Sequence, residues 1–177
     1  MAPPVDLQIL RFLNHPGSPA LDHAMAAASN RGLLLVIAAI IAVYLAVRSP
    51  HRWVASVLLL LSIGAADLVA VRAVKPAVER VRPCHSLASV RAPVGCGSGK
   101  SFPSAHAADT GAAAAIVAWG APALTPLALI IAVVVGISRV YLGVHYPSDV
   151  VAGWIIGAAV AAVLIAIARL RYAVHVR

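Results

Sequence analysis

Long apolar runs separated by short polar stretches dominate the pattern of hydrophobic and polar positions along the chain. Five runs are expected to cross a bilayer as helices, at residues 32–47, 53–74, 103–119, 127–137 and 147–170. A spanning helix needs about 20 apolar residues, so the first run is short for a span. The pattern predicts an all-α fold, a polytopic bundle of transmembrane helices with five spans.

The first 31 residues follow a different pattern, in which apolar and polar positions are mixed. Proline, glycine and serine at residues 16–19 break any helix there. We expect short interfacial or re-entrant helices, which would make six helices if the segment counts as one; the alternative is a poorly ordered terminus. No basic start precedes an apolar core, so no cleavable signal peptide is expected. The predicted division is an N-terminal segment, residues 1–31, and a transmembrane domain, residues 32–177.

Composition supports the membrane class. Of 177 residues, 62% are hydrophobic and 11% are charged, whereas a soluble domain is about half apolar and a quarter charged. The net charge of +8 would suggest nucleic acid as a partner in a soluble protein. No basic face with interleaved aromatic residues accompanies it, so we expect no nucleic-acid partner. The basic residues are instead expected to flank spans or to line a site for an anionic substrate.

The distribution of basic residues predicts the orientation in the membrane. Those that follow the first and the fifth span fall on one side: Arg48, Arg52, Arg169, Arg171 and Arg177. The positive-inside rule makes that side cytoplasmic. The polar stretches 75–102 and 138–149 then face outward. These outward-facing stretches are also basic, which agrees with the positive-inside rule only if their positive charges bind a substrate.

The first chemical segment follows the second span. Lys75 and Arg82 are seven residues apart, so on a helix they would share one face across two turns, roughly 10 Å. Pro76 disfavours helix at Lys75, which predicts a kink there. The alternative is an interfacial basic cluster that holds lipid headgroups.

The second segment starts the third span. Pro103 and Ser104 precede His106, and proline in a first turn is typical of a helix start. A helix N-terminus presents free N–H groups and a positive dipole to an anion. A simple helix cap with an interfacial histidine is the alternative.

The third segment, residues 138–149, lies between the last two spans and holds Arg139, His145 and Asp149. If Pro147 is the first helical residue, Asp149 is the third and can reach back toward the turn that holds His145. A carboxylate on one ring nitrogen fixes the tautomer and leaves the other nitrogen as nucleophile or base. The alternatives are that Arg139 snorkels to headgroups and that Asp149 only complements the helix dipole.

Together the three segments resemble the signature of the type 2 phosphatidic acid phosphatase superfamily of integral-membrane lipid phosphatases. That signature is Lys, six residues, Arg-Pro; then Pro-Ser-Gly-His; then Ser-Arg, five residues, His, three residues, Asp. The matching residues are Lys75, Arg82, Pro83, Pro103, Ser104, His106, Ser138, Arg139, His145 and Asp149. Ala105 departs from the signature, because it stands where the family has glycine, and we expect it to tighten or reshape the pocket.

The resemblance implies a role for each matching residue. His145 would attack phosphorus to form a phosphohistidine, with Asp149 as its orienting carboxylate. His106 would protonate the leaving oxygen and later activate water. The phosphoryl oxygens would be bound by three cations, a hydroxyl and main-chain N–H groups: Lys75, Arg82, Arg139, Ser104 and the backbone near Ala105. The family needs no metal, and no cofactor is expected.

The expected activity is hydrolysis of a lipid phosphate or diphosphate at the plasma (inner) membrane, with the site facing the periplasm or exterior. Members of this size resemble polyprenyl diphosphate phosphatases, which makes undecaprenyl diphosphate the first candidate, cleaved to undecaprenyl phosphate and phosphate. Phosphatidylglycerophosphate, phosphatidic acid and lipid A phosphates are the alternatives. Haloperoxidase-like chemistry with vanadate and a non-catalytic lipid or ion carrier are further alternatives. The oligomeric state stays open.

Two remaining features concern packing. Cys84 and Cys96 share the outward-facing loop, where disulfides persist. A disulfide between them would hold that loop beside the site. Two free thiols are the alternative. Gly153 and Gly157 form a G-x-x-x-G step that permits close helix contact. Whether that contact is internal or between subunits is left open by the sequence.

Overall fold

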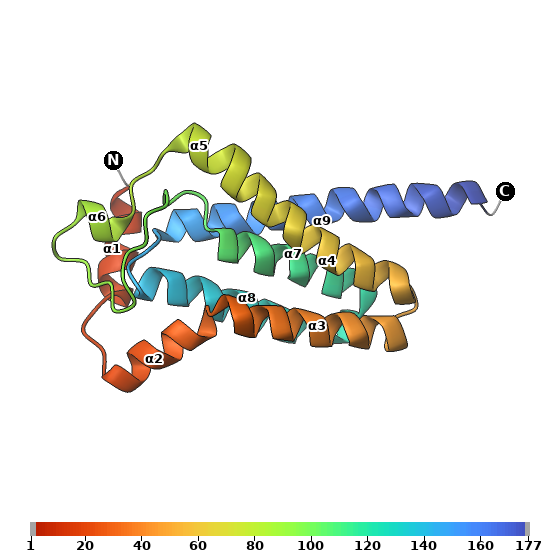
Figure 1. Cartoon of the computed structure of the whole chain (residues 1–177), viewed down its shortest axis with the longest axis horizontal. Coiled ribbons are helices and arrows are strands. Elements are labelled where there is room, and N and C mark those ends of the chain that lie inside the picture. The colour runs from red at the N-terminus through yellow and green to blue at the C-terminus, as the bar shows by residue number, and fades with distance from the viewer. Residues whose placement is uncertain (1–2, 176–177) are drawn as a thin grey trace.

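The computed structural model describes residues 3–175 and shows helices and loops, with no strand in that range (Figure 1). Two short N-terminal helices precede a bundle: α1 (Pro4–Leu13) and α2 (Pro19–Ala28). The long helices are α3 (Arg31–Arg48), α4 (Arg52–Leu68), α7 (Ala105–Gly120), α8 (Thr125–Tyr141) and α9 (Pro147–His175). The predicted all-α fold is confirmed. Arg177, one of the basic residues on the predicted cytoplasmic side, lies outside the described residues.

All five predicted apolar runs form helices, and within residues 3–175 four segments are long and apolar enough to cross a membrane. These are Arg31–Arg48, Arg52–Ser86, Pro122–Tyr141 and Pro147–Arg171. The run at 127–137 lengthens into α8 because its polar neighbours at both ends continue the helix. The fifth helix, α7, has 16 residues. It lies in the middle of the bundle, in contact with α3, α4, α8 and α9 (Figure 1).

The helix that carries Lys75 continues through the position where a kink is predicted. α4 runs into a π-helical turn, η1 (Val69–Val74), and then into α5 (Lys75–Val78). Lys75 is helical, with φ −56° and ψ −46°, so the expectation that Pro76 disfavours helix at Lys75 is wrong. The wider π turn changes the hydrogen-bond register ahead of the proline, and proline near the start of a helical segment needs no N–H donor. The helical segment ends at Glu79, whose φ is +51°.

Close packing of α9 on α7 brings two of the chemical segments together. A Cβ atom on Gly157 would lie 2.0 Å from the Ala108 carbonyl oxygen, and one on Gly153 would lie 2.5 Å from that of Ser104. The G-x-x-x-G step therefore makes its contact within one chain, with α7. As a result the starts of α7 and α9 lie side by side, and the Ser104 N–H donates to the Asp149 carbonyl oxygen at 2.9 Å.

The N-terminal helices are folded against the bundle, α1 on α8 and α9 and α2 on α8. Asn14 joins them to it: its Nδ2 donates to the Tyr141 carbonyl at 2.6 Å, and its Oδ1 accepts from the Arg91 N–H at 2.8 Å. Asp22 adds an ion pair with Arg91 at 2.8 Å. The described N-terminal residues thus form ordered helices, and their position relative to a bilayer stays a prediction.

The long loop between α5 and α7 is attached to the turn that carries His145. It contains a short helix, α6 (Pro83–Ser86), and a disulfide between Cys84 and Cys96, whose Cα atoms are 5.9 Å apart. The Cys84 N–H donates to the Gly143 carbonyl at 3.1 Å. Gly143 has φ +71°, and a Cβ there would lie 2.1 Å from the Arg91 carbonyl oxygen, so glycine permits this close approach.

These contacts gather α1, α2, α6 and the polar loops at one end of the bundle (Figure 1). The α3–α4 turn and the end of α9 lie at the other end (Figure 1). A short 3₁₀ turn, η2 (Pro122–Leu124), joins α7 to α8 at that end. The predicted placement of stretches 75–102 and 138–149 at one common end is therefore confirmed.

Candidate active site

The turn between α8 and α9 holds His145, which is 3% exposed. Pro147 is the first residue of α9 and Asp149 is the third, as predicted. Asp149 has no exposed surface. The first turn of α9 therefore brings the carboxylate back against the turn that holds the histidine, inside the protein.

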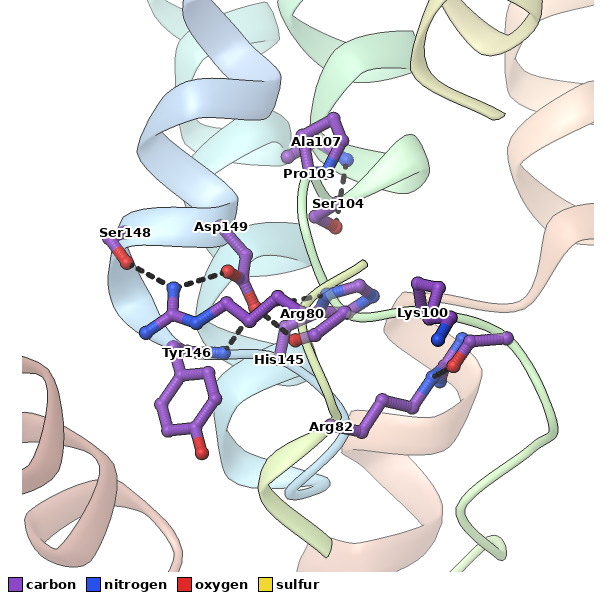
Figure 2. Close-up of polar contacts among 12 residues, drawn as sticks. Arg80, Arg82, Lys100, Pro103, Ser104, Ala107, His145, Tyr146, Ser148 and Asp149 are labelled. Atoms are coloured by element: carbon purple, nitrogen blue, oxygen red, sulfur yellow. Dashed lines mark hydrogen bonds and ion pairs between the residues drawn. The ribbon is translucent and has the colours of Figure 1, made fainter. Parts of the chain in front are cut away.

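The Asp149 carboxylate is held by four groups (Figure 2). Its Oδ2 accepts from the Tyr146 N–H at 2.8 Å and from the Ser101 hydroxyl, and lies 3.6 Å from His145 Nδ1. That last distance is longer than a hydrogen bond. Its Oδ1 accepts from Arg80 Nη1 at 2.6 Å. The carboxylate lies on the Nδ1 side of the imidazole, which leaves Nε2 as the nitrogen available for chemistry.

Burial determines the protonation state of His145. Desolvation lowers its pKa from 6.5 to about 4, partly opposed by the Asp149 carboxylate and reinforced by the charges of Arg139 and Lys75. The imidazole is therefore neutral at pH 7. A neutral ring with a carboxylate at Nδ1 can act as a nucleophile through Nε2.

Three cations approach the same place from different elements. Lys75 at the start of α5 donates from Nζ to the carbonyls of Lys100 at 2.7 Å and Pro103 at 2.9 Å. Arg82 donates from Nε to the Gly99 carbonyl at 2.8 Å and from Nη1 to that of Cys96 at 3.0 Å. These bonds tie both side chains to the loop that leads into α7.

Arg139, near the end of α8, donates from Nη1 to the Ser29 hydroxyl at 2.9 Å, and its Nε is buried and makes no hydrogen bond within residues 3–175. Lys75, Arg82 and Arg139 lie close enough for mutual electrostatic repulsion. In the described part of the chain none of the three forms an ion pair with a carboxylate. Neutral oxygens hold these side chains by hydrogen bonds.

The start of α7 contributes Ser104 and His106. Ser104 is fully buried and caps the helix, accepting from the Ala107 N–H at 3.4 Å. His106, half-buried in the first turn, lies within electrostatic reach of His145 and Arg139. The structure therefore brings the two predicted histidines to one cluster of cations.

Ala105, the departure from the motif, is 6% exposed and belongs to the apolar core that includes Ala66 and Ala70 of the α4–η1 segment. Its methyl group is accommodated by that core.

An apolar groove of about 260 Å³ lies between α3, α4, α7 and α8. Asp109 and Thr110, one turn below His106, line it together with aliphatic side chains of the four helices. An ion pair of 2.9 Å between Arg31 and Asp67 lines it as well. The groove thus extends from the neighbourhood of the polar cluster along the apolar helices.

Five residues around Asp149 were not predicted from the sequence. They are Asp6, Arg80, Ser101, Tyr146 and Ser148. The only local signals are that Arg80 lies two residues before Arg82 and that Tyr146 and Ser148 lie between the motif residues His145 and Asp149. Nothing in the pattern indicates that Asp6, in the first helix, reaches this place.

The cluster around the two histidines does not resemble a metal site. Among residues 3–175, no group of three His, Cys, Asp or Glu side chains comes together. The charged groups that converge with the two histidines are one carboxylate, Asp149, and three cations. The expectation that no metal is needed stays a prediction, for which a chelator is the test.

Known proteins share this sequence pattern and fold. The sequence matches the family model of the PAP2 superfamily over residues 32–173. The crystal structure of a PAP2-type phosphatidylglycerolphosphate phosphatase from Bacillus subtilis is similar at a TM-score of 0.72 and 28% identity, over 93% of this chain and 85% of that one. Aquifex aeolicus LpxE, at 22% identity and a TM-score of 0.76 over 91% and 94% of the two chains, shares the fold.

Curated relatives carry names of lipid phosphatases. The decaprenylphosphoryl-5-phosphoribose phosphatase of Mycobacterium tuberculosis is 43% identical over 91 residues, 51% of this chain and 49% of that protein. The chain thus spans about half the length of this relative. The lipid A 4'-phosphatase of Bacteroides thetaiotaomicron is 32% identical over 163 residues, 86% of this chain and 72% of that protein. The chain belongs to the PAP2 superfamily, the type 2 phosphatidic acid phosphatases that its three motifs resemble.

Proposed function

We propose that this membrane protein is a lipid phosphatase that cleaves a phosphate or diphosphate from a lipid through a phosphohistidine. The observation that carries the proposal is the trio Lys75, Arg82 and Arg139, which has no carboxylate partner in the described structure and lies beside a buried neutral histidine. Phosphoryl transfer is accelerated mainly by positioning and by stabilising charge on the equatorial oxygens. A group of three cations without a carboxylate ion-pair partner supplies that stabilisation.

The first step forms a bond between His145 Nε2 and phosphorus and breaks the bond from phosphorus to the leaving oxygen. His106, protonated in the complex under the negative charge of the bound phosphate, gives its proton to that oxygen, so the lipid product leaves neutral at this position. Asp149, on the Nδ1 side of His145, stabilises the positive charge that the ring acquires.

In the second step a water molecule attacks phosphorus, His106 takes its proton, and the bond from His145 to phosphorus breaks. Inorganic phosphate leaves and both histidines return to their starting states. Ser104, with the N–H groups at the start of α7, binds the phosphoryl oxygens as a helix N-terminus does.

A lipid substrate is supported by the apolar groove that begins one turn from His106. Undecaprenyl diphosphate stays our first candidate, because an undecaprenyl-diphosphatase of Sulfolobus acidocaldarius is 45% identical over 58 residues, 32% of this chain. A phosphorylated decaprenyl glycolipid is a second candidate, favoured by the 43% identity to the mycobacterial phosphatase. Both share a polyprenyl tail. Phosphatidylglycerophosphate, phosphatidic acid and lipid A phosphates complete the substrate panel.

The proposed setting is the plasma membrane, with the site at the periplasmic or outer face. Arg48 and Arg52 at the opposite end of the bundle support this orientation through the positive-inside rule. A cysteine placed at exposed His23 should then react with an impermeant thiol reagent in intact cells.

The test is phosphate release by the purified protein in detergent from each lipid of the panel, with and without EDTA. We expect release from at least one polyprenyl substrate, no effect of EDTA, and a loss of about 10³-fold or more in His145→Ala. His23→Ala, at an exposed histidine of α2, is the matched control and should keep its activity. If no lipid of the panel releases phosphate, the proposed enzymatic activity is wrong and the alternative of a non-catalytic carrier stands. Activity in His145→Ala would contradict the phosphohistidine intermediate. Loss of activity in EDTA would contradict a metal-free reaction.

A further inference from the structure

The N-terminal helix reaches the proposed site through a single buried carboxylate. Asp6, in the first turn of α1, is 4% exposed. Its Oδ1 accepts from the Ser148 N–H at 2.9 Å, and its Oδ2 accepts from the Ser148 hydroxyl at 2.5 Å. The same Oδ2 accepts from Arg80 Nη2 at 2.8 Å. Asp6 therefore binds both the first turn of α9 and an arginine of the long loop.

Arg80 joins this carboxylate to the one beside the nucleophile. Its Nη1 donates to Asp149 Oδ1 at 2.6 Å and to the Ser148 hydroxyl at 2.7 Å. The guanidinium carbon lies 4.0 Å from the centre of the Tyr146 ring. Figure 2 shows the guanidinium group between Ser148 and Asp149, with the Tyr146 ring beside it. The planar fork lets one arginine bridge two carboxylates at fixed positions, which a lysine cannot do.

The charges of this network do not cancel. Two carboxylates share one guanidinium, so the Asp6–Arg80–Asp149 trio carries a net charge of −1. Without Asp6, Arg80 would pair with Asp149 alone and neutralise it. With Asp6, negative charge remains on the side of Asp149 that faces His145, where the phosphorylated ring becomes positive.

We propose that Asp6 is a positioning residue for the reaction, which through Arg80 and Ser148 fixes Asp149 and keeps its charge available to His145. The N-terminal helix is then part of the catalytic apparatus and not only a surface element. This inference rests on the proposed function.

The structure offers a matched control for a purely structural role. Asp22 of α2 also ties the N-terminal segment to the bundle, through Arg91 at 2.8 Å and the Tyr141 hydroxyl at 2.6 Å. These partners lie outside the Asp6–Arg80–Asp149 network. A general loosening of the N-terminal helices should therefore result from Asp22→Asn as well as from Asp6→Asn.

The experiment compares Asp6→Asn and Asp22→Asn for steady-state phosphate release and thermal unfolding. We expect Asp6→Asn to lower kcat about tenfold with KM within about twofold, because the effect falls on the chemical step. Asp22→Asn should keep both constants within about twofold. Equal activity losses in the two variants, or a wild-type kcat in Asp6→Asn, would overturn the proposal.

A double-mutant cycle tests whether Asp6 acts through Arg80. Asp6→Asn should have less than about a twofold effect in an Arg80→Gln background, since the bridge is already absent. Arg80→Lys preserves the charge and protects the test against misfolding of the glutamine variant. It should still lower kcat, because an ammonium group cannot hold both carboxylates in the observed geometry. Full additivity of the two changes would contradict the bridge.

Orthovanadate separates this inference from the proposed function. Vanadium accepts a fifth ligand, so vanadate bound to His145 among the same cations mimics the transition state of the chemical step, and its binding needs no lipid. We expect Asp6→Asn to weaken vanadate binding about tenfold, measured by tryptophan fluorescence, and Asp22→Asn to bind like the wild type. If no lipid releases phosphate, the proposed function is wrong. The vanadate affinities of the wild type, Asp6→Asn and Asp22→Asn still decide the role of Asp6. Equal vanadate affinity in all three proteins, or none in the wild type, overturns the inference.

Discussion

The two halves of the candidate site are built on opposite principles. The nucleophile half consists of His145 and Asp149 with the groups that hold them, and there every carboxylate oxygen has a donor. The cation half consists of Lys75, Arg82 and Arg139, whose hydrogen bonds within residues 3–175 go to carbonyl and hydroxyl oxygens. The carboxylate of the nucleophile half forms an ion pair within the described chain, whereas the cations of the other half form none.

The difference shows what each half is organised for. A buried carboxylate paired with an arginine and two neutral donors is stable without a ligand. Cations held side by side by neutral oxygens repel one another, and an oxyanion with two or more negative charges relieves that repulsion. The nucleophile half is therefore preorganised, whereas the cation half is completed by the phosphate it binds.

The largest effect is expected from the nucleophile half, where Asp149→Asn should lower kcat by about 10³-fold or more, as for the orienting aspartate of a catalytic triad. The amide cannot carry the negative charge that Arg80 and His145 face, so the melting temperature should fall too. Phosphate release and thermal unfolding measure both. Asp22→Asn, whose carboxylate pairs with Arg91 of the long loop, is the control and should retain most activity. A stable, active Asp149→Asn variant would remove the basis of the comparison.

The cation half should respond differently, because its cations form no ion pair in the described residues and repel one another. Arg139→Gln is expected to lower kcat/KM about 10²-fold, since a donor to the transition state is lost. Its melting temperature should stay equal or rise, because the repulsion with Lys75 and Arg82 decreases. The combination of lower activity with undiminished stability separates this half from the other. A loss of stability as large as in Asp149→Asn would show that Arg139 is structural.

Most of the fold and the motif positions were predictable, because helices follow from local patterns of apolar residues. Proline is typical of a first helical turn, so the sequence alone placed Asp149 beside the His145 turn, and α9 does begin at Pro147. The partners of these residues were not predictable in the same way. Asp67 pairs with Arg31 on α3, a partner that is determined by how α3 packs on α4.

The network of Asp6 and Arg80 shows the same limit more clearly. An aspartate in the first turn of an N-terminal helix is usual for its dipole, and nothing local distinguishes Asp6 from that role. Its contact with Arg80 depends on α1 packing against α9 and on the loop after α5 returning to the same place. Such pairings are properties of the tertiary structure, so a single sequence does not reveal them.

A smaller effect is expected from the pH dependence of stability. The pKa of His145 is lowered by burial from 6.5 to about 4. Between these values the unfolded chain binds a proton at this position that the folded protein does not, so the folded state loses stability as pH falls through that window. Above pH 6.5 this contribution is fully present.

Melting temperatures of the wild type and of His145→Gln between pH 7 and pH 4 measure this contribution. The glutamine variant lacks the proton uptake, so its melting temperature should decline less than that of the wild type toward pH 4. His23→Gln, at an exposed position, should follow the wild type. Parallel curves for all three proteins would mean that His145 is not held neutral by its surroundings, and the preorganised nucleophile half would lose its main support.

The smallest effect concerns Ala105, where the family motif has glycine. Its methyl group lies in the apolar core that includes Ala66 and Ala70, which favours packing into that core over the expected tightening of the pocket. Ala105→Gly should therefore leave kcat and KM within about twofold and cost about 1 kcal/mol of stability, since glycine is a poorer helix residue and the core loses a methyl group. Ala115→Gly, on the same helix away from the site, should cost a similar amount and serves as the control for stability. A rise in kcat of tenfold or more in Ala105→Gly alone would show that the methyl group does restrict the backbone at the phosphate, and would place this residue in the cation half after all.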